Sequence, residues 1–382
     1  MITQHSEHNS ALAVDDSSSE VIEQQAELLK EKLLQAKTVV QETEITREQL
    51  SLSKKLLNWR TLIPLIIVIV AIIFFVQKTH IDPHQTWTAI RSANIIFFLA
   101  AFVTYYLSFP LRAMRWRLLL ENVGFTKENG VHLPKFWKLT EIIFISWFAN
   151  AIVPAKLGDL YRAYLLRQET HVSATRSFGT VLAERLLDLI VLLLLFLPAV
   201  IISLHSNLPW QVRTGLEITL VGIVIGIAGL FAMRIFRNHI ARLIPTRFSE
   251  HYNHFQEGML GSFQRLPVLT GLTLGVWACE ALRFFFIAMA LNLIGGNIVH
   301  IVSAAFFIAL GEALLTVVPF TGGGVGLVEG GMLAMIALFT NALNVATAAI
   351  LLDRTISLFS ILIFGAIVFM VAFGRQAAKQ VK

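Results

Sequence analysis

Long apolar runs without a single charge constrain this chain more than any other feature of its sequence. Residues 62–76 and 189–204 contain no charged side chain, and 55% of the 382 residues are hydrophobic whereas only 15% are charged. A soluble domain of this size carries about 25% charged residues. Uncharged runs of this length are typical of membrane-spanning helices, which satisfy their own backbone hydrogen bonds. The sequence therefore predicts an all-α polytopic membrane protein and excludes a large soluble catalytic domain.

The apolar residues form eight segments, of which six are long enough for full spans. The predicted spans cover residues 61–77, 93–111, 178–204, 215–233, 267–294 and 346–373. The other two segments are broken: residues 139–168 at Pro154 and Gly158, and residues 301–339 at Pro319 and the glycines after it. Broken backbone at membrane depth is tolerated only where it is buried in protein or lines a wet cavity. We therefore expect two re-entrant hairpins in addition to the six spans.

The positions of lysine and arginine predict the orientation of the spans. Basic residues concentrate in segments 112–138 and 234–265 and again after residue 373, whereas residues 284–353 contain neither lysine nor arginine. Short basic segments remain in the cytoplasm. We therefore expect cytoplasmic N- and C-termini in a bacterial inner membrane. The net charge of +6 then reflects membrane topology, and no nucleic-acid partner is expected.

An acidic extension, residues 1–57, precedes the predicted membrane domain, residues 58–375, and a cytoplasmic tail of residues 376–382 follows it. Residues 1–50 contain four basic and ten acidic side chains. Apolar residues at spacings of three and four within residues 22–43 are typical of a coiled-coil seam. The seam is compatible with a homodimer or a protein partner. A solvated amphipathic helix that leads to the membrane is the alternative, which we favour.

The order of spans and hairpins repeats once along the chain. The first half consists of two spans, a hairpin and a third span, and the second half repeats this order. Because three is an odd number of crossings, the second half has the opposite orientation in the membrane. Acid–arginine pairs follow the two hairpins at equivalent positions, Glu184-Arg185 and Asp353-Arg354, and Arg112 has a looser counterpart in Arg283. Inverted repeats with broken helices near the midplane are typical of alternating-access transporters. Two ordinary kinked helices in an eight-span bundle are the alternative.

Ionisable and polar residues in or beside the spans are the candidates for substrate binding and translocation. A charge near the bilayer centre costs about 2.5–3.5 kcal/mol on insertion scales, so each one needs a partner or water. Local ion pairs that only hold helices together are the alternative for each pair. Arg112, Arg115 and Arg117 are most simply topology anchors that reach lipid headgroups. The candidates are Arg112, Arg115, Asn150, Pro154, Lys156, Gly158, Asp159, Arg162, Glu184, Arg185, Asp188, Glu280, Arg283, Glu312, Pro319, Gly322, Gly323, Gly324, Gly326, Glu329, Asp353 and Arg354.

The two broken segments also predict the chemistry of the ligand. The glycines from Gly322 to Gly326 leave backbone N–H groups free at the start of the next half-helix, where anions such as phosphate bind. Basic side chains beside both breaks add charge-assisted contacts. Together they predict an anionic headgroup carried on apolar tails. Cys279 is the only cysteine, no strand precedes the glycines and no catalytic triad stands out, so no metal, cofactor or catalytic residue is predicted.

Four motifs at these positions form a spaced set that is more specific than any one of them. They are Arg112–Trp116 (RAMRW), Asn150–Arg162 (NAIVPAKLGDLYR), Ala183–Asp188 (AERLLD) and Pro319–Glu329 (PFTGGGVGLVE). The set resembles the transmembrane region of the lysylphosphatidylglycerol synthase family, also called the flippase-like family, over about residues 58–375.

This resemblance implies a function as well as a fold. In bifunctional members, this region is implicated in moving aminoacylated phosphatidylglycerol across the bilayer, while a soluble C-terminal domain performs the aminoacylation. Because the chain continues for only nine residues after Phe373, we expect no synthase activity. The resemblance implies a non-enzymatic translocator of an anionic or aminoacylated phospholipid, or of a polyprenyl-phosphate lipid. A non-catalytic scaffold for a glycosyltransferase or a lipid-modifying enzyme is the alternative, and a membrane-embedded enzyme is a weaker one.

Overall fold

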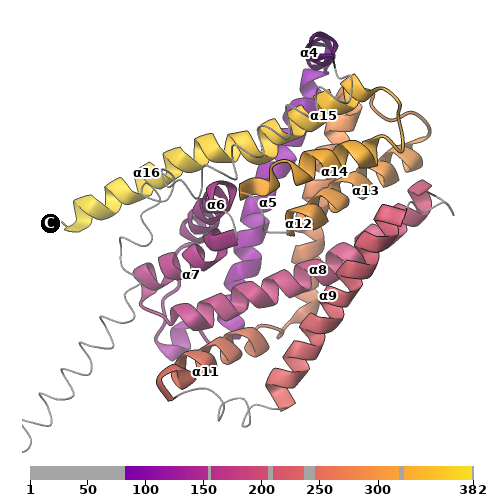
Figure 1. The fold of residues 1–382 in the computed structure, drawn as a ribbon. Helices are drawn as coiled ribbons and strands as arrows, with labels where there is room; N and C mark the ends of the chain where they lie inside the picture. The colour runs from indigo at the N-terminus through magenta and orange to yellow at the C-terminus, as the bar shows by residue number, and fades with distance from the viewer. Residues whose placement is uncertain (1–81, 154–155, 205–209, 236–245, 318–321, 381–382) are drawn as a thin grey trace, which may run out of the picture. The chain divides into compact units, whose positions relative to one another are not determined.

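The computed structural model describes residues 82–153, 156–204, 210–235, 246–317 and 322–380 (Figure 1). All of them belong to the second of the two units into which the chain divides, residues 60–382. The predicted span 61–77, the predicted seam 22–43, Pro154 and Pro319 lie outside the described residues.

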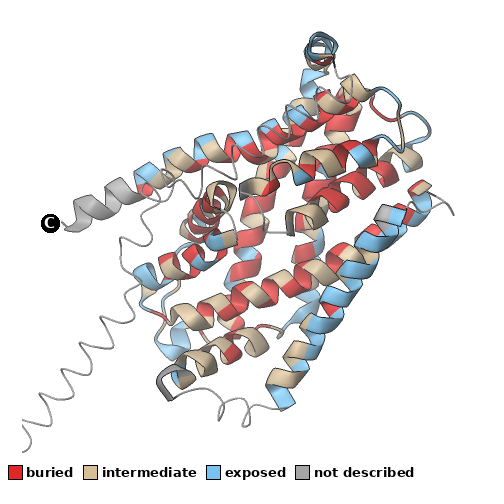
Figure 2. Ribbon diagram, in the orientation of Figure 1, coloured by how far each residue is buried: buried red, intermediate tan, exposed pale blue. Residues whose placement is uncertain are grey.

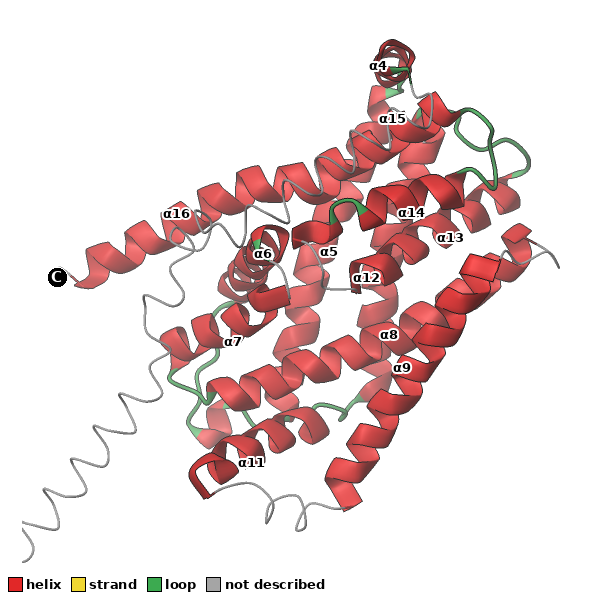
Figure 3. Cartoon of the chain, viewed as in Figure 1, coloured by secondary structure: helices red, strands yellow, loops and turns green. Residues whose placement is uncertain are grey.

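Every regular element in the described part of the chain is a helix (Figure 3). The α-helices are α4 (Pro83–Ser92), α5 (Ile95–Asn122), α6 (Phe136–Ile152), α7 (Leu157–Thr170), α8 (Ala174–Leu204), α9 (Trp210–Ile235), α11 (Thr246–Gly261), α12 (Leu266–Ala290), α13 (Ile298–Val317), α14 (Leu327–Ile336), α15 (Leu343–Arg354) and α16 (Ser360–Gln380). Short helical turns are η1 (Lys127–Asn129), η3 (Gly322–Gly324) and η4 (Thr355–Phe359), the last of them a π-turn that joins α15 to α16. The all-α prediction is confirmed.

The length and hydropathy of the helices confirm a multi-span membrane protein. The six described segments that are long and apolar enough to cross a membrane are Ile95–Asn122, Ala174–Leu204, Arg213–Ile235, Leu266–Ala290, Ile298–Thr316 and Leu343–Ala372. Five of them coincide with predicted spans, whereas Ile298–Thr316 belongs to the second predicted hairpin. Since this helix has the length of a full crossing, the re-entrant course of that hairpin stays a prediction.

An antiparallel pair, α5 and α12, forms the centre of the described unit. At one end of the pair the Asn94 N–H donates to the Ala290 carbonyl oxygen at 2.9 Å. At the other end the Asn122 side chain donates to the carbonyl oxygens of Ser262 and Gln264, at 3.0 and 2.7 Å. We name these two ends the Asn94 end and the Asn122 end. The orientation predicted from the basic segments assigns the Asn122 end to the cytoplasm.

The two predicted hairpins pack across this pair in an exchanged manner. In the first hairpin, α6 contacts α7 and lies against α16, which comes from the other half of the chain. In the second, α13 contacts α14 and lies against α8. Ring contacts occur at both crossings, Phe148 with Phe369 at 5.9 Å and Phe196 with Phe307 at 5.4 Å. This exchange is compatible with the inverted repeat, which stays a prediction.

Burial separates the central helices from the helix α9 (Figure 2). The described part of α9 exposes a series of large apolar side chains, including Ile218, Val224 and Phe231. It approaches α8 where Gly226 lies beside Leu186. An exposed apolar face of this extent is costly in water and suits the hydrocarbon of a bilayer.

Glycines set the close approach between α8 and α11. The Cβ of any larger residue at Gly258 would meet the backbone carbonyl of Arg176, and one at Gly179 would meet the backbone of Phe255. We expect Gly258→Ala to lower the free energy of unfolding by about 1–3 kcal/mol, as overpacking does. Thermal unfolding in detergent micelles measures this change. Gly222→Ala is the control, because nothing lies within 4 Å of the added methyl group, and equal losses in both variants would contradict the close approach.

Candidate functional site

The charged candidate residues of the sequence lie in two clusters, one toward each end of the α5–α12 pair. The Arg115 cluster consists of Arg115, Lys156, Asp159, Arg162, Glu184, Arg185 and Asp188. The Arg283 cluster consists of Arg112, Glu280, Arg283, Glu312, Glu329, Asp353 and Arg354. Most of these side chains are buried, so each cluster must satisfy its charges internally.

Arg115 is the centre of the first cluster and has no exposed surface. Its two terminal nitrogens lie 2.5 Å from Glu184 and 2.5 Å from Asp188, both on α8. It also donates to the hydroxyl of Thr273 on α12 at 3.0 Å. The second oxygen of Glu184 accepts from Arg162 of α7 at 2.8 Å. Four helices therefore meet through one guanidinium and one carboxylate.

The first hairpin is closed by side chains around Gly158. The Gly158 N–H donates to the Asn150 side chain at 2.8 Å, and the Gly158 carbonyl oxygen accepts from Ser146 at 2.7 Å. A Cβ at this position would overlap the Ser146 carbonyl oxygen, so glycine is required. The neighbouring Asp159 accepts two hydrogen bonds from Arg185, at 2.8 and 2.9 Å, and one from Asn150 at 3.2 Å. The hairpin is thereby fixed to α8.

Lys156 stands at the start of α7 in an unusual conformation. Its φ is 52°, in the left-handed region that non-glycine residues rarely adopt. It is partly exposed, and within the described residues it forms no ion pair. Arg185, Asp159 and Asp188 lie within electrostatic range of its ammonium group. With Lys156 counted, the Arg115 cluster holds four cations and three anions.

Arg283 is the centre of the second cluster. It donates to Asp353 on α15, to Glu312 on α13 at 2.9 Å and to Glu280 on its own helix at 3.3 Å. Its guanidinium lies over the ring of Tyr105, 5.5 Å from the ring centroid. One arginine thus shares its donors among three carboxylates.

The tip of the second hairpin is held by Glu329. Its side chain accepts from the Gly326 N–H at 2.5 Å, at the start of α14, and its other oxygen lies 2.8 Å from Arg354. Gly323, Gly324 and Gly326 all have positive φ values, and Gly322 begins the same turn. The expectation that this break leaves its N–H groups free for an anion is therefore wrong at Gly326, because the Glu329 carboxylate occupies that donor.

An ion pair at the middle of the α5–α12 pair joins the two helices. Arg112 on α5 lies 2.8 Å from Glu280 on α12, and the Arg112 guanidinium stacks over Trp147 at 4.4 Å. Arg112 and Arg115 are both buried, whereas Arg117 is largely exposed. The interpretation of Arg112 and Arg115 as headgroup anchors is therefore wrong.

The two clusters occupy equivalent depths from opposite ends. Arg115 stands seven residues before the end of α5 at Asn122, and Arg283 stands seven residues before the end of α12 at Ala290. Their contacts correspond too: the pairs Arg115–Glu184 and Asp159–Arg185 match the pairs Arg283–Asp353 and Glu329–Arg354. These contacts pair Arg283 with Arg115, and not with Arg112 as the sequence suggested.

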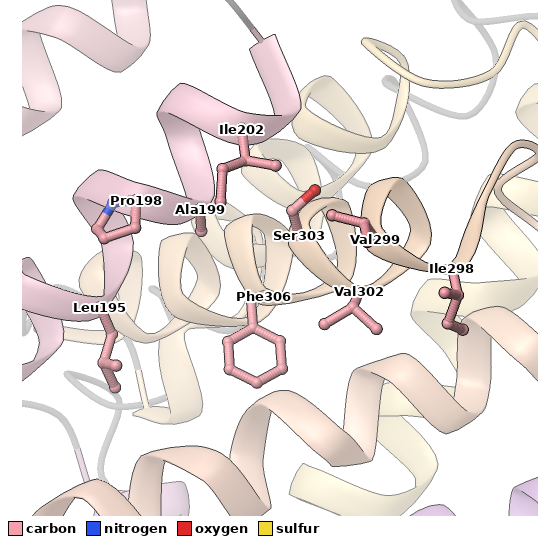
Figure 4. A pocket seen from close by; sticks show the side chains of 9 residues that line it. All are labelled: Leu195, Pro198, Ala199, Ile202, Ile298, Val299, Val302, Ser303 and Phe306. Atoms are coloured by element: carbon pink, nitrogen blue, oxygen red, sulfur yellow. The ribbon is translucent and has the colours of Figure 1, made fainter.

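An apolar groove lies between α8 and α13, two helices that also carry residues of the clusters (Figure 4). Its volume is about 380 Å³. Asp188 stands seven residues before Leu195 on α8, and Glu312 stands six residues after Phe306 on α13, so each lies about 10 Å along its helix from the groove. The lining residues are Leu195, Pro198, Ala199, Ile202, Ile298, Val299, Val302, Ser303 and Phe306.

Three residues that complete the clusters were not among the candidates from the sequence. Thr273 accepts from Arg115, Tyr105 lies under Arg283, and Trp147 lies under Arg112. The two threonines of α12, Thr270 and Thr273, are a weak polar signal within an apolar span that could have identified Thr273. The two aromatic residues carry no such signal, because aromatic side chains are common throughout the spans.

The fold and the site together define a class: a helical multi-span membrane protein with two buried clusters of ion pairs between its spans. The profile of the lysylphosphatidylglycerol synthase transmembrane region matches residues 62–365. The chain belongs to this family, as its four motifs predicted.

Comparison with individual proteins finds archaeal relatives. A UPF0104 membrane protein of Methanocaldococcus jannaschii is 33% identical over 59% of this chain and 94% of its own length. A UPF0104 membrane protein of Methanothermobacter thermautotrophicus is 25% identical over 84% of this chain and 95% of its own length. The glycosyltransferase AglD of Haloferax volcanii is 25% identical over 65% of this chain, but the match covers only 44% of that relative. The expected bacterial origin stays a prediction.

Two arginines of α5 offer a direct test of the buried cluster. Arg115→Gln should lower the free energy of unfolding by about 3–5 kcal/mol, because it leaves two buried carboxylates short of a partner. Arg117→Gln should cost less than about 1 kcal/mol, because its pair with Glu121 is exposed to solvent. Chemical unfolding of both variants in detergent micelles measures the difference, and equal effects would contradict the burial of Arg115.

Proposed function

We propose that this protein is a lipid translocator that moves an anionic headgroup between the two leaflets of the membrane. The observation that carries the proposal is Lys156: a lysine held in a left-handed conformation at a helix start, partly exposed, beside a cluster whose other charges are paired. The same proposal assigns no enzymatic activity, metal or cofactor to the chain.

The strained backbone at Lys156 argues that its side chain has a role. The equivalent residue of the second hairpin is Gly326, since each stands three residues before the acid that meets an arginine, Asp159 or Glu329. Gly326 also has a positive φ, which costs glycine nothing. A lysine in the left-handed region costs roughly 1–2 kcal/mol. Folding alone would therefore favour glycine at both positions.

The charge of the Arg115 cluster fits an anionic ligand. Four cations face three carboxylates, so one positive charge is available, and it lies at the start of α7, where the helix dipole also favours an anion. A phosphate group of a lipid supplies the matching charge. Phosphatidylglycerol, aminoacylated phosphatidylglycerol and polyprenyl phosphate all carry such a group.

The groove between α8 and α13 fits the other part of a lipid. Its lining is apolar except for Ser303, and it lies between two helices long enough to span the membrane. An apolar cavity of about 150 Å³ holds a benzene ring, so this groove has room for roughly a dozen carbon atoms. A lipid tail there would lie about 10 Å along the helices from the charged clusters.

Translocation by purified protein in liposomes tests this function. Labelled phosphatidylglycerol, lysyl-phosphatidylglycerol and polyprenyl phosphate are assayed in parallel, and we expect at least one to be moved. Lys156→Gly should reduce its initial rate at least tenfold, because a hydrogen bond to a charged group contributes about 1.5–3 kcal/mol. The thermal stability of Lys156→Gly should not fall, since glycine relieves the strained backbone.

Lys127→Gln is the matched control, because Lys127 is exposed and lies on the predicted cytoplasmic side. It should translocate at the rate of the unchanged protein. An unchanged rate in Lys156→Gly would reject the assignment of the headgroup site. Failure of the folded protein to move any of the three lipids would reject the translocator in favour of the second function below.

A second function, a non-catalytic membrane partner of a glycosyltransferase, is favoured by one observation. The relative named glycosyltransferase AglD contains the matching region as less than half of its length. A chain in which this region forms the membrane domain is therefore compatible with a role as the membrane partner of a separate glycosyltransferase. Deletion of residues 1–57 distinguishes the two functions: a scaffold should lose association with the enzyme on affinity purification from native membranes, whereas a translocator should keep its activity in liposomes.

A further inference from the structure

The Arg283 cluster contains one more carboxylate than it has arginines. Three guanidinium groups face four carboxylates, and apart from Glu329 each of these side chains is no more than 10% exposed. The surplus cation of the Arg115 cluster is Lys156. The two clusters adjoin on α5, where Arg112 of one stands three residues from Arg115 of the other. Within the described residues Lys156 forms no ion pair with the carboxylates of the Arg283 cluster, so it does not neutralise the surplus one directly.

A buried surplus charge is strongly unfavourable unless a ligand neutralises it. Among the described residues, no group of three acidic, histidine or cysteine side chains is placed to hold a metal ion, which favours a proton over a metal cation. Chains of acidic residues inside membrane proteins mark proton paths in pumps and transporters. The surplus carboxylate is thus a site for proton binding.

We propose that the Arg283 cluster binds and releases one proton, shared by the carboxylates of Asp353 and Glu312, and that this exchange drives movement of the second hairpin. The proton comes from water on one side of the membrane, adds to a carboxylate oxygen, and returns to water on the other side. The proton site stands independently of the lipid, whereas its coupling to transport rests on the function proposed above.

The geometry selects Asp353 and Glu312 among the four carboxylates. Both accept from Arg283, so they lie on one guanidinium and repel each other when both are ionised. Glu280 has a close second partner in Arg112 at 2.8 Å, and Glu329 has Arg354 and the Gly326 N–H, whereas the second contact of Glu312, with Arg354, is 3.8 Å long. The Ser357 hydroxyl lies 3.4 Å from the second oxygen of Asp353.

The remaining groups around the pair come from the helices packed against α13 and α15. Of these, α8 carries Glu184, Arg185 and Asp188, whose ion pairs lie in the Arg115 cluster. On α5 these are Tyr105, which donates to the Ser357 carbonyl oxygen at 3.1 Å, and Arg112. On α12 they are Glu280 and Arg283, and on α15 Arg354 lies next to Asp353. On α14 the facing group is Glu329.

A chain of charges leads from this pair to the tip of the second hairpin. Glu312 lies 2.9 Å from Arg283 and 3.8 Å from Arg354, and Arg354 in turn holds Glu329 at 2.8 Å. Protonation of Glu312 or Asp353 removes one negative charge from Arg283 and changes the field at Arg354. The proton therefore changes the stability of the Arg354–Glu329 ion pair, which fixes the start of α14.

Infrared difference spectroscopy of the purified protein tests the proton site without any lipid. A carboxylic-acid C=O band should be present in acidic buffer, disappear as the pH is raised, and shift in deuterium oxide. Glu312→Gln and Asp353→Asn should each remove or shift this band. Glu184→Gln, which alters the corresponding carboxylate of the Arg115 cluster, should leave it in place.

The outcomes separate this proposal from the lipid function. Absence of a titrating band in the unchanged protein between pH 5 and pH 9 would overturn the proton site, as would a band that persists in both variants. Because Asp353→Asn can fail to fold, Glu312→Gln and the deuterium shift of the unchanged protein provide independent tests. The lipid function fails instead if the band titrates as expected but none of the three lipids is moved.

Coupling is measured in the same liposomes with an imposed pH gradient. We expect the gradient to raise the initial rate of lipid movement at least fivefold in the unchanged protein and to have no effect on Glu312→Gln. A rate that is insensitive to the gradient in the unchanged protein would overturn the coupling step.

Discussion

Pairing of buried arginines with carboxylates from other helices is the constraint on which the rest of this structure depends. A guanidinium cannot be left without partners in a bilayer, so Arg115 requires Glu184 and Asp188 of α8, and Arg283 requires Asp353 of α15 and Glu312 of α13. Each contact fixes one helix against the α5–α12 pair. The apolar surfaces of the spans contact lipid as favourably as they contact each other. The arrangement of the spans therefore follows from these ion pairs as much as from apolar packing.

The hairpins depend on the same pairs, because each begins its second helix with an acid that an arginine holds. Asp159 and Glu329 stand in the first turns of α7 and α14, where a negative charge also favours the helix dipole. Their partners, Arg185 and Arg354, each follow the acidic residue that binds the central arginine. Two adjacent residues therefore connect the core to the tip of the hairpin in each half.

Sequence patterns predicted the helical class, the positions of five described spans and the family, because apolar runs and motif spacing are local properties. They also identified the charged residues that form the two clusters, since a charge inside an apolar run is conspicuous. The spacing of three on one helix predicted that Glu280 and Arg283 can pair, and they do. Partners far apart in the chain were not predicted: Arg112 meets Glu280 and Arg115 meets Glu184. The groove at Phe306 was missed for the same reason, because a groove depends on how two helices cross.

Equivalent geometry with unequal charge distinguishes the two clusters, and the proposed transport depends on this difference. The positions match between halves, but Arg162 has Met332 as its equivalent, three residues after the hairpin acid, and Lys156 has Gly326. Glu312 adds an anion to the other cluster. Under the two proposals above, one end of the α5–α12 pair takes an anion and the other takes a proton. In the predicted inverted repeat, two conformations of the scaffold have similar energies, and ligands that bind the unequal charges shift the balance between them.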